Sequence, residues 1–180
     1  MTISTITDGS DLAPDDEEVL YDSLTGLPGL LLQRAHLVHA LKRATRERTR
    51  VAVLYLDVDD FRDINDRLGS AFGDEVLVVL AARLQVCLRD TDMIARLEGD
   101  AFSIVCEDLR DPRDLAVVVR RVTEALATPI RIADSIVQVR ATVGSAMSDG
   151  GDRPWQIAAA ADRAMSEARA GCRSDLSVPS

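Results

Sequence analysis

The segment Arg96-Leu97-Glu98-Gly99-Asp100-Ala101-Phe102 decides how this chain is expected to fold. Short apolar runs flank its centre, over residues 93–97 and 102–106. Two apolar runs joined by a tight loop that contains glycine predict a β-hairpin. We therefore expect two antiparallel strands with Asp100 in the loop between them.

A longer apolar run lies upstream, from Val51 to Val58, and three acids stand at its end. A continuous apolar run of this length predicts a strand buried on both faces, with Asp57 near its C-terminal end. If the hairpin lies beside this strand, Asp57 and Asp100 converge. Two carboxylates and a backbone carbonyl make a hard oxygen site suited to Mg²⁺ bound with substrate phosphates. The competing interpretation of Asp100 is a solvated loop acid, because the chain holds 30 acids.

The rest of the chain alternates between helical and strand patterns. Asp22 or Thr25 is a candidate cap for the first helix. Helices are predicted over 30–48, 60–67, 74–88, 112–127 and 154–170, and strands over 130–132 and 136–145, with Asp134 in the turn between the strands. This order predicts an α+β fold, an α/β sandwich with a central sheet covered by helices. We expect one domain over residues 21–174, a mobile acidic leader over 1–20 and a disordered tail over 175–180.

The charge balance narrows the function classes. The net charge of -9 argues against non-specific nucleic-acid binding, which needs an excess of Lys and Arg. No apolar run is long enough to span a bilayer, and the first 20 residues lack the pattern of a secretion signal. The three cysteines are scattered without zinc-ligand spacing, as expected for reduced thiols in a cytoplasmic protein.

Several ordered segments resemble the GGDEF family of diguanylate cyclases. Residues 57–66 resemble the family's Asp-x-Asp-x-Phe-Lys-x-x-Asn-Asp segment, and residues 69–74 resemble its Gly-His-x-x-Gly-Asp. Residues 22–27, Asp-Ser-Leu-Thr-Gly-Leu, match its opening turn. The segment 98–102 is similar to the turn that names the family, Gly-Gly-Asp/Glu-Glu-Phe. The resemblance runs from about Asp22 to Arg173.

This resemblance implies a fold and a chemistry. The fold is a mostly antiparallel sheet flanked by helices, similar to the palm of nucleotidyl cyclases and polymerases. Diguanylate cyclases condense two GTP molecules into cyclic di-GMP, with two domains facing each other in a dimer. Two Mg²⁺ or Mn²⁺ ions neutralise phosphate charge in this reaction.

The resemblance also assigns roles to residues of this chain. Asp57, the Val58 carbonyl and Asp100 would hold metal, while Asp100 and Arg96 would act at the reacting phosphate. Arg96 has a competing interpretation as a partner in an ion pair on the strand face. The remaining positions form the substrate site, with the backbone near Phe61 and Arg62 meeting phosphates, Asn65 and Asp74 reading guanine, and Arg169 and Arg173 pairing with the triphosphate.

A second nucleotide site is implied nine residues before Glu98. Arg89 and Asp92 form an Arg-x-x-Asp motif at the position of the family's product-inhibition site for cyclic di-GMP. Arginine can grip guanine O6 and N7, and aspartate can accept from N1 and N2. The competing interpretation is a charge cluster at a helix end.

Two departures from the family turn predict a loss of cyclase activity. Glu98 replaces a glycine and adds negative charge near phosphates, and Ala101 replaces an acid. Losing a general base costs roughly 10²–10⁴-fold in rate. We therefore expect a degenerate domain that binds GTP, cyclic di-GMP or both, and that signals through a homodimer or an attached or partner domain. The alternatives are an active diguanylate cyclase and a dimerisation or scaffold module without ligand.

Overall fold

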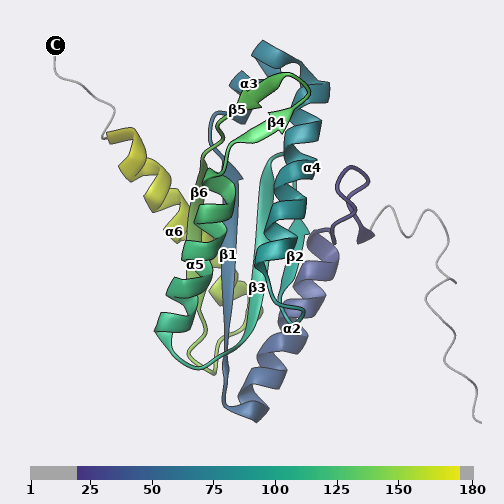
Figure 1. Cartoon of the computed structure of the whole chain (residues 1–180). Coiled ribbons are helices and arrows are strands. Elements are labelled where there is room, and N and C mark those ends of the chain that lie inside the picture. The colour runs from purple at the N-terminus through teal and green to yellow at the C-terminus, as the bar shows by residue number, and fades with distance from the viewer. Residues whose placement is uncertain (1–19, 175–180) are drawn as a thin grey trace, which may run out of the picture.

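The computed structural model describes residues 20–174, with side chains described as far as Gly171. Apart from Leu20, the predicted leader lies outside the described residues, as does the predicted tail. Figure 1 shows the elements in order, which are α2 (Leu30–Glu47), β1 (Arg50–Val58), α3 (Phe61–Leu68), α4 (Ser70–Cys87), β2 (Met93–Arg96), β3 (Ala101–Leu109), α5 (Pro112–Ala127), β4 (Ile130–Ile132), β5 (Ser135–Val137), β6 (Ala141–Met147) and α6 (Pro154–Ser174).

A four-stranded sheet forms the centre of the fold, in the order β2-β3-β1-β6. Its three strand pairs are all antiparallel. β1 lies between β3 and β6, so that Tyr55 pairs with Ser103 on one side and with Gly144 on the other. The predicted α+β fold with an antiparallel sheet and a β2–β3 hairpin is confirmed.

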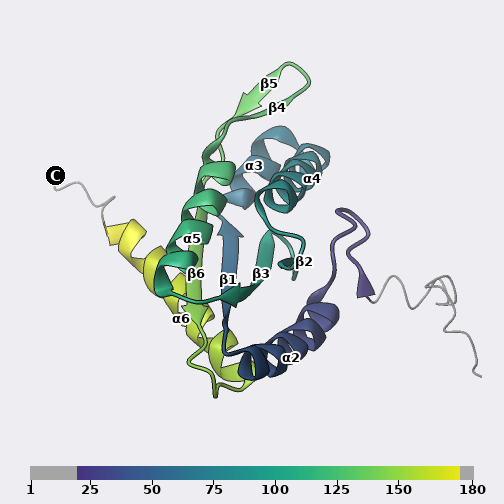
Figure 2. The ribbon, with the colours of Figure 1, turned by 60° about the horizontal axis from the view of Figure 1, so that its bottom comes forward.

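Helices cover both faces of this sheet, as Figure 2 shows. On one face, Leu54 and Leu56 of β1 pack in a core with α4 and α5. On the other face, Val51 and Val53 pack with α2 and α6. Alternate residues of β1 therefore enter two separate cores, which explains why the strand shows no alternation of polar and apolar residues before Asp57.

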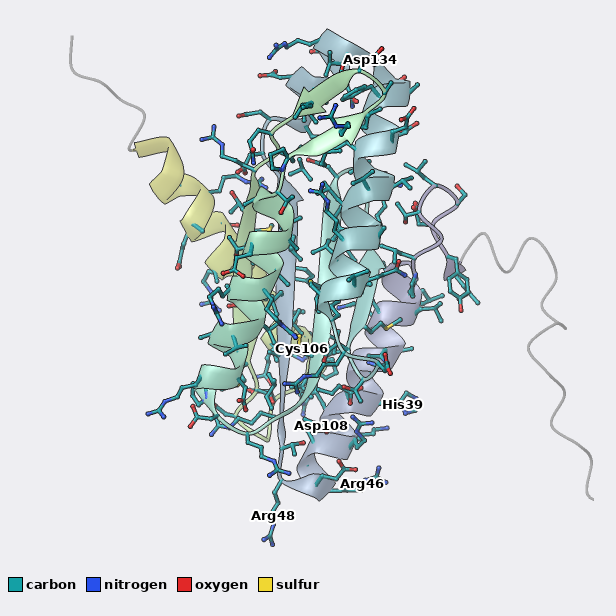
Figure 3. The ribbon with its side chains drawn as sticks, viewed as in Figure 1. His39, Arg46, Arg48, Cys106, Asp108 and Asp134 are labelled. Carbon is teal, nitrogen blue, oxygen red and sulfur yellow. The ribbon has the colours of Figure 1, made fainter. Side chains whose placement is uncertain are left out.

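The predicted strand over 136–145 is wrong, because this segment forms two strands. β5 pairs only with β4, in a separate two-stranded sheet, while β6 joins the main sheet beside β1. Residues 138–140 leave the ladder between them. The small hairpin projects past the main sheet, and Figure 3 shows Asp134 at its tip, at the opposite end of the molecule from Arg48.

Two helix starts also differ from the prediction. The N-cap of α2 is Gly29, which offers no side-chain cap, so neither Asp22 nor Thr25 caps this helix. Asp22 instead accepts hydrogen bonds from the backbone N–H and the hydroxyl of Thr25, and so closes a turn of its own. α4 begins at Ser70 rather than Asp74, and it includes Gly73. None of the helices within residues 20–174 is long and apolar enough to cross a membrane.

Candidate functional site

Two carboxylates meet where β1 ends beside the β2–β3 turn. Asp57 pairs across the ladder with Ala101, and Asp100 is the residue just before Ala101. Burial raises the pKa of Asp100, and the nearby charge of Asp57 raises it further. The predicted convergence of these two acids is therefore present in the fold.

Arg169 of α6 lies against this pair of acids. Its Nη2 is 2.5 Å from Oδ1 of Asp57. The sequence predicted a phosphate partner for Arg169, whereas the structure places the guanidinium on a carboxylate that was predicted to bind metal. Arg173 follows one helical turn later in α6, and its side chain lies outside the described residues.

The turn between β2 and β3 needs glycine at only one of the two family positions. Gly99 has φ +59°, a left-handed conformation that favours glycine. Glu98 is exposed and is not among the described residues with positive φ. The backbone therefore accepts a side chain at 98 without strain, and the effect of Glu98 is electrostatic rather than conformational.

Ala101 opens onto a mostly apolar cavity, which is also lined by Asp162. The cavity has a volume of about 360 Å³ and lies between the sheet and α6. Its lining includes Tyr55, Leu97, Phe102 and Met165. At the place of the family's second acid, residue 101 therefore offers only a methyl group, and the acid that lines the cavity is Asp162 of α6.

The largely buried Arg96 side chain is held by two turns, one that contains Asp22 and one that contains Gly99. Its Nη1 donates to both carboxylate oxygens of Asp22 at 2.9 and 3.0 Å, and its Nε and Nη2 donate to the Gly99 carbonyl at 2.9 and 2.7 Å. Burial opposes ionisation of Asp22, but the hydrogen bonds from Thr25 and Arg96 outweigh it and lower the pKa of Asp22. The interpretation of Arg96 as an ion-pair partner agrees with this geometry, which ties the opening turn to the β2–β3 turn.

The corner between α3 and α4 carries four of the residues predicted to contact GTP, which are Phe61, Arg62, Asn65 and Asp74. α3 begins at Phe61 without a side-chain cap, so the first backbone N–H groups, near Arg62, face outward from its N-terminus. Asn65 Oδ1 is buried, with no hydrogen-bond partner in the described part of the chain. A Cβ at Gly73 would lie 1.9 Å from that oxygen, so glycine at 73 makes room for Asn65. Asp74 follows and is exposed.

The Arg89–Asp92 motif lies at the other end of the hairpin, before β2. Asp92 accepts hydrogen bonds from the backbone N–H groups of Arg89 at 3.0 Å and Glu107 at 3.3 Å. The side chain of Arg89 is exposed and makes no ion pair within residues 20–174. The motif is therefore a structured turn with its guanidinium available to solvent.

Arg121 of α5 belongs to the same end of the hairpin, and the sequence analysis missed it. Its Nε and Nη2 are buried without a hydrogen-bond partner among the described residues. Burial raises the pKa of the Cys106 thiol and Asp92 raises it further, while Arg121 and Arg89 oppose this effect. Cys106, labelled in Figure 3, is buried, and the charges of Asp92, Arg121 and Arg89 all act on its thiol. No spacing signal in the sequence connects α5 with the Arg-x-x-Asp motif.

The oxygen donors at Asp57 and Asp100 suit a hard divalent cation that shares its coordination with a ligand. The described residues contain no group of three His, Cys, Asp or Glu side chains arranged to hold a metal ion. Mg²⁺ is commonly held by one or two carboxylates together with substrate phosphates, and it keeps several waters. The two converging acids fit that kind of site and do not fit an all-protein cage.

Comparison with known proteins agrees with this arrangement. The family described as "Diguanylate cyclase, GGDEF domain" matches residues 19–175. Diguanylate cyclase TpbB of Pseudomonas aeruginosa is 39% identical over 147 residues, which cover 81% of this chain and 34% of the relative. The bifunctional diguanylate cyclase/cyclic di-GMP phosphodiesterase MucR of the same organism is 35% identical over 151 residues, covering 83% of this chain and 22% of the relative.

A solved structure of the GGDEF domain of TpbB from Pseudomonas aeruginosa superposes with a TM-score of 0.81 at 38% identity, covering 84% of this chain and 89% of that one. The chain belongs to the GGDEF family of diguanylate cyclase domains. It spans about a third or less of the length of the curated relatives TpbB and MucR.

Proposed function

We propose that this GGDEF domain binds GTP, cyclic di-GMP or both as a regulatory or receptor module, and that it lacks normal cyclase activity. The observation that carries the proposal is Ala101, which stands across the ladder from Asp57 and lines a mostly apolar cavity. Its methyl group can neither take nor give a proton. A lost general base alone costs roughly 10²–10⁴-fold in rate.

Glu98 supports the same conclusion through its charge. It is exposed in the turn that carries Asp100, where a cyclase brings two triphosphates together. A carboxylate near a polyphosphate repels it, and the repulsion grows as water is excluded. Glu98 therefore opposes the reacting arrangement more than it opposes binding of one nucleotide at a distance from the turn.

The α3–α4 corner supports binding of a guanine nucleotide. Asn65 Oδ1 can accept from a guanine N–H group, and the Asp74 carboxylate can accept from N1 and N2. The uncapped N-terminus of α3 offers backbone N–H groups and the positive end of a helix dipole to phosphates. These contacts do not depend on the residues at 98 and 101.

A bound nucleotide would bring a divalent cation to the two acids. Mg²⁺ or Mn²⁺ would be held by Asp57, the Val58 carbonyl and Asp100, and it would supply positive charge that neutralises the phosphates. Burial and the charge of Asp57 raise the pKa of Asp100 and so disfavour its carboxylate form. The positive charge of the cation would stabilise that carboxylate.

The other end of the hairpin supports binding of cyclic di-GMP. The side chain of Arg89 is exposed, while Nε and Nη2 of Arg121 are buried, and neither guanidinium has an internal partner among the described residues. Both charges lie near the carboxylate of Asp92. Guanidinium groups bind phosphates and the O6/N7 edge of guanine through paired donors. Binding here would be passed on to a second copy of the chain or to an attached or partner signalling domain.

A turnover assay tests the proposal. Purified protein is incubated with GTP and Mg²⁺ or Mn²⁺, and cyclic di-GMP is measured by chromatography, with the double variant Glu98→Gly/Ala101→Glu as the restored-turn comparison. We expect no product from the natural sequence. Turnover that disappears in Asp57→Ala would establish an active cyclase instead.

Calorimetry with each nucleotide completes the test. We expect heat of binding with GTP, cyclic di-GMP or both, and we expect Arg89→Ala to remove cyclic di-GMP binding while sparing GTP. If neither nucleotide gives heat, the domain acts as a scaffold without ligand. If Arg89→Ala and the natural sequence bind cyclic di-GMP equally, the assignment of the second site fails.

A further inference from the structure

The ion pair between Arg169 and Asp57 uses an oxygen that a metal ion would need. Nη2 of Arg169 lies 2.5 Å from Oδ1 of Asp57, closer than a water or an ion could fit between them. We propose that Arg169 is an internal counter-ion that competes with a divalent cation for Asp57, so that metal binds only when the guanidinium leaves. This inference rests on the proposed role of Asp57 as a metal ligand.

The packing of α6 explains why the guanidinium reaches this carboxylate. α6 lies directly on β6 at Gly144, where a Cβ would come within 2.1 Å of the Met165 backbone nitrogen. Tyr55 pairs with Gly144, so Asp57 lies two residues further along β1 on the same face of the sheet. Arg169 lies one helical turn after Met165, on the same side of α6. A close contact in the backbone therefore sets the position of the ion pair.

The charges around Arg169 make it the counter-ion of a group of acids rather than of one acid. Its guanidinium interacts electrostatically with Asp57, Asp59 and Asp100. A divalent cation at this place would neutralise the same carboxylates. The two cations would repel each other as well as share a ligand, so binding of one opposes binding of the other.

Arginine suits this role better than the lysine that occupies the position in the family. A guanidinium is always charged, is weakly hydrated and presents a planar fork that matches a carboxylate. The same fork matches a phosphate. An arriving triphosphate can therefore draw Arg169 away from Asp57 and free that oxygen for metal. The exchange predicts that nucleotide and metal binding strengthen each other.

Mn²⁺ binding to nucleotide-free protein tests the competition directly. Free Mn²⁺ is followed by electron paramagnetic resonance during titration of the full chain, for the natural sequence and for Arg169→Gln. We expect Arg169→Gln to bind Mn²⁺ at least about fivefold more tightly, which is the lower end of common coupling between sites. An affinity that is equal or weaker, or no Mn²⁺ binding to either protein, overturns the proposal.

Matched variants separate this competition from a general effect of charge. Arg163→Gln removes the same charge from an exposed position on the same helix, and we expect its Mn²⁺ affinity to match the natural sequence. The higher Mn²⁺ affinity expected for Arg169→Gln should vanish in the double variant Arg169→Gln/Asp57→Asn. Arg169→Lys keeps the charge and the helix, and we expect an intermediate affinity. An equal gain in Arg163→Gln would overturn the proposal.

The outcome can be told apart from that of the proposed function. GTP binding is measured separately, by calorimetry without metal. Tighter Mn²⁺ binding in Arg169→Gln without any GTP binding would uphold the competition and remove the nucleotide role. GTP binding with unchanged Mn²⁺ affinity would uphold the nucleotide role and overturn the competition.

Discussion

At one end of the β2–β3 hairpin, Arg96 and Arg169 are both paired with acids of the same chain, Asp22 and Asp57. At the other end, the guanidinium groups of Arg89 and Arg121 have no such partners among the described residues, and the nearby acid Asp92 is held by backbone N–H groups. At the first end, the arginines form internal ion pairs that fix the turn. At the second end, the arginines remain unpaired within the described residues and can bind an anion from outside the chain.

Gly144→Ala should have the largest effect on stability, because it displaces α6 and therefore the guanidinium of Arg169. The added Cβ would meet backbone atoms of Met165 and Ala161, which cannot step aside as a flexible side chain can. We expect a loss of about 3 kcal/mol in the free energy of unfolding, measured by urea denaturation.

Gly151→Ala is the matched control, since a Cβ there meets nothing within 4 Å. It should change stability by no more than about 0.5 kcal/mol. A similar loss in both variants would show that α6 is not fixed by its contact with β6.

Arg96→Ala should have the next largest effect. The substitution leaves the carboxylate of Asp22 and the carbonyl of Gly99 without their donors, and Arg96 is largely buried. Hydrogen bonds to charged groups contribute about 1.5–3 kcal/mol, so we expect a loss of about 2 kcal/mol in urea denaturation.

The control is Arg113→Ala. The side chain of Arg113 is 95% exposed, and its Nε lies 4.0 Å from Oδ1 of Asp111. Exposed pairs contribute about 0.2–1 kcal/mol. If Arg96→Ala loses no more than this control, Arg96 does not fix the turn and the contrast between the two ends disappears.

Arg121→Gln should give the opposite pattern, with weaker binding and unchanged stability. Its buried Nε and Nη2 have no partner among the described residues, so their removal breaks no internal hydrogen bond. We expect about tenfold weaker cyclic di-GMP binding by calorimetry, which corresponds to about 1.4 kcal/mol.

Arg120→Gln changes the neighbouring arginine of α5, which is exposed and pairs with Glu124. We expect it to bind cyclic di-GMP as the natural sequence does. Equal weakening by both substitutions would mean that only the overall charge of α5 matters at this end.

Asp100→Asn should have the smallest effect, and its sign should depend on pH. The pKa of Asp100 is raised by burial and by Asp57, so its contribution to stability is present below the unfolded pKa and is lost as pH rises through the folded pKa. At neutral pH we expect Asp100→Asn to gain about 0.5 kcal/mol, and the gain should vanish in acid.

Asp22→Asn should lose stability at neutral pH, and this loss should vanish in acid. The pKa of Asp22 is lowered, so its contribution is present above the unfolded pKa and is lost as pH falls through the folded pKa. Urea denaturation at neutral and at acidic pH measures the stability of both variants, with Asp134→Asn at the exposed hairpin tip as the control. A gain for Asp22→Asn at neutral pH would contradict the assigned pairing with Arg96.

Local patterns in the sequence predicted most of the fold. The apolar run over 51–58 and the loop at Gly99 indicated β1 and the β2–β3 hairpin, and both are present. The segment over 136–145 was misread because an apolar run does not say where a strand changes partner. The start of α4 was placed at Asp74, after Gly73, because the role of this glycine, making room for Asn65, depends on the packing of α3 against α4.

The pairings at the candidate site were harder to predict, because they join residues that are far apart in the chain. Arg96 lies 74 residues from Asp22, and no spacing rule relates the two positions. The pairing of Arg169 with Asp57 depends on how α6 lies on β6. A glycine in the middle of the β6 run was the one signal available, since glycine inside a strand often marks the close approach of another backbone.

The separation of β4 and β5 from the main sheet has a consequence for the exchange of backbone amides with solvent. β1 is paired on both sides and buried between two layers of helices, so its amides should exchange only when the whole domain opens. The β4–β5 hairpin has three residues in each strand and pairs with no other strand within residues 20–174. Ile130 and Ile132 of β4 pack in the core, while β5 exposes Ile136. The amides of this hairpin should exchange by local opening, much sooner than those of the strand that carries Asp57.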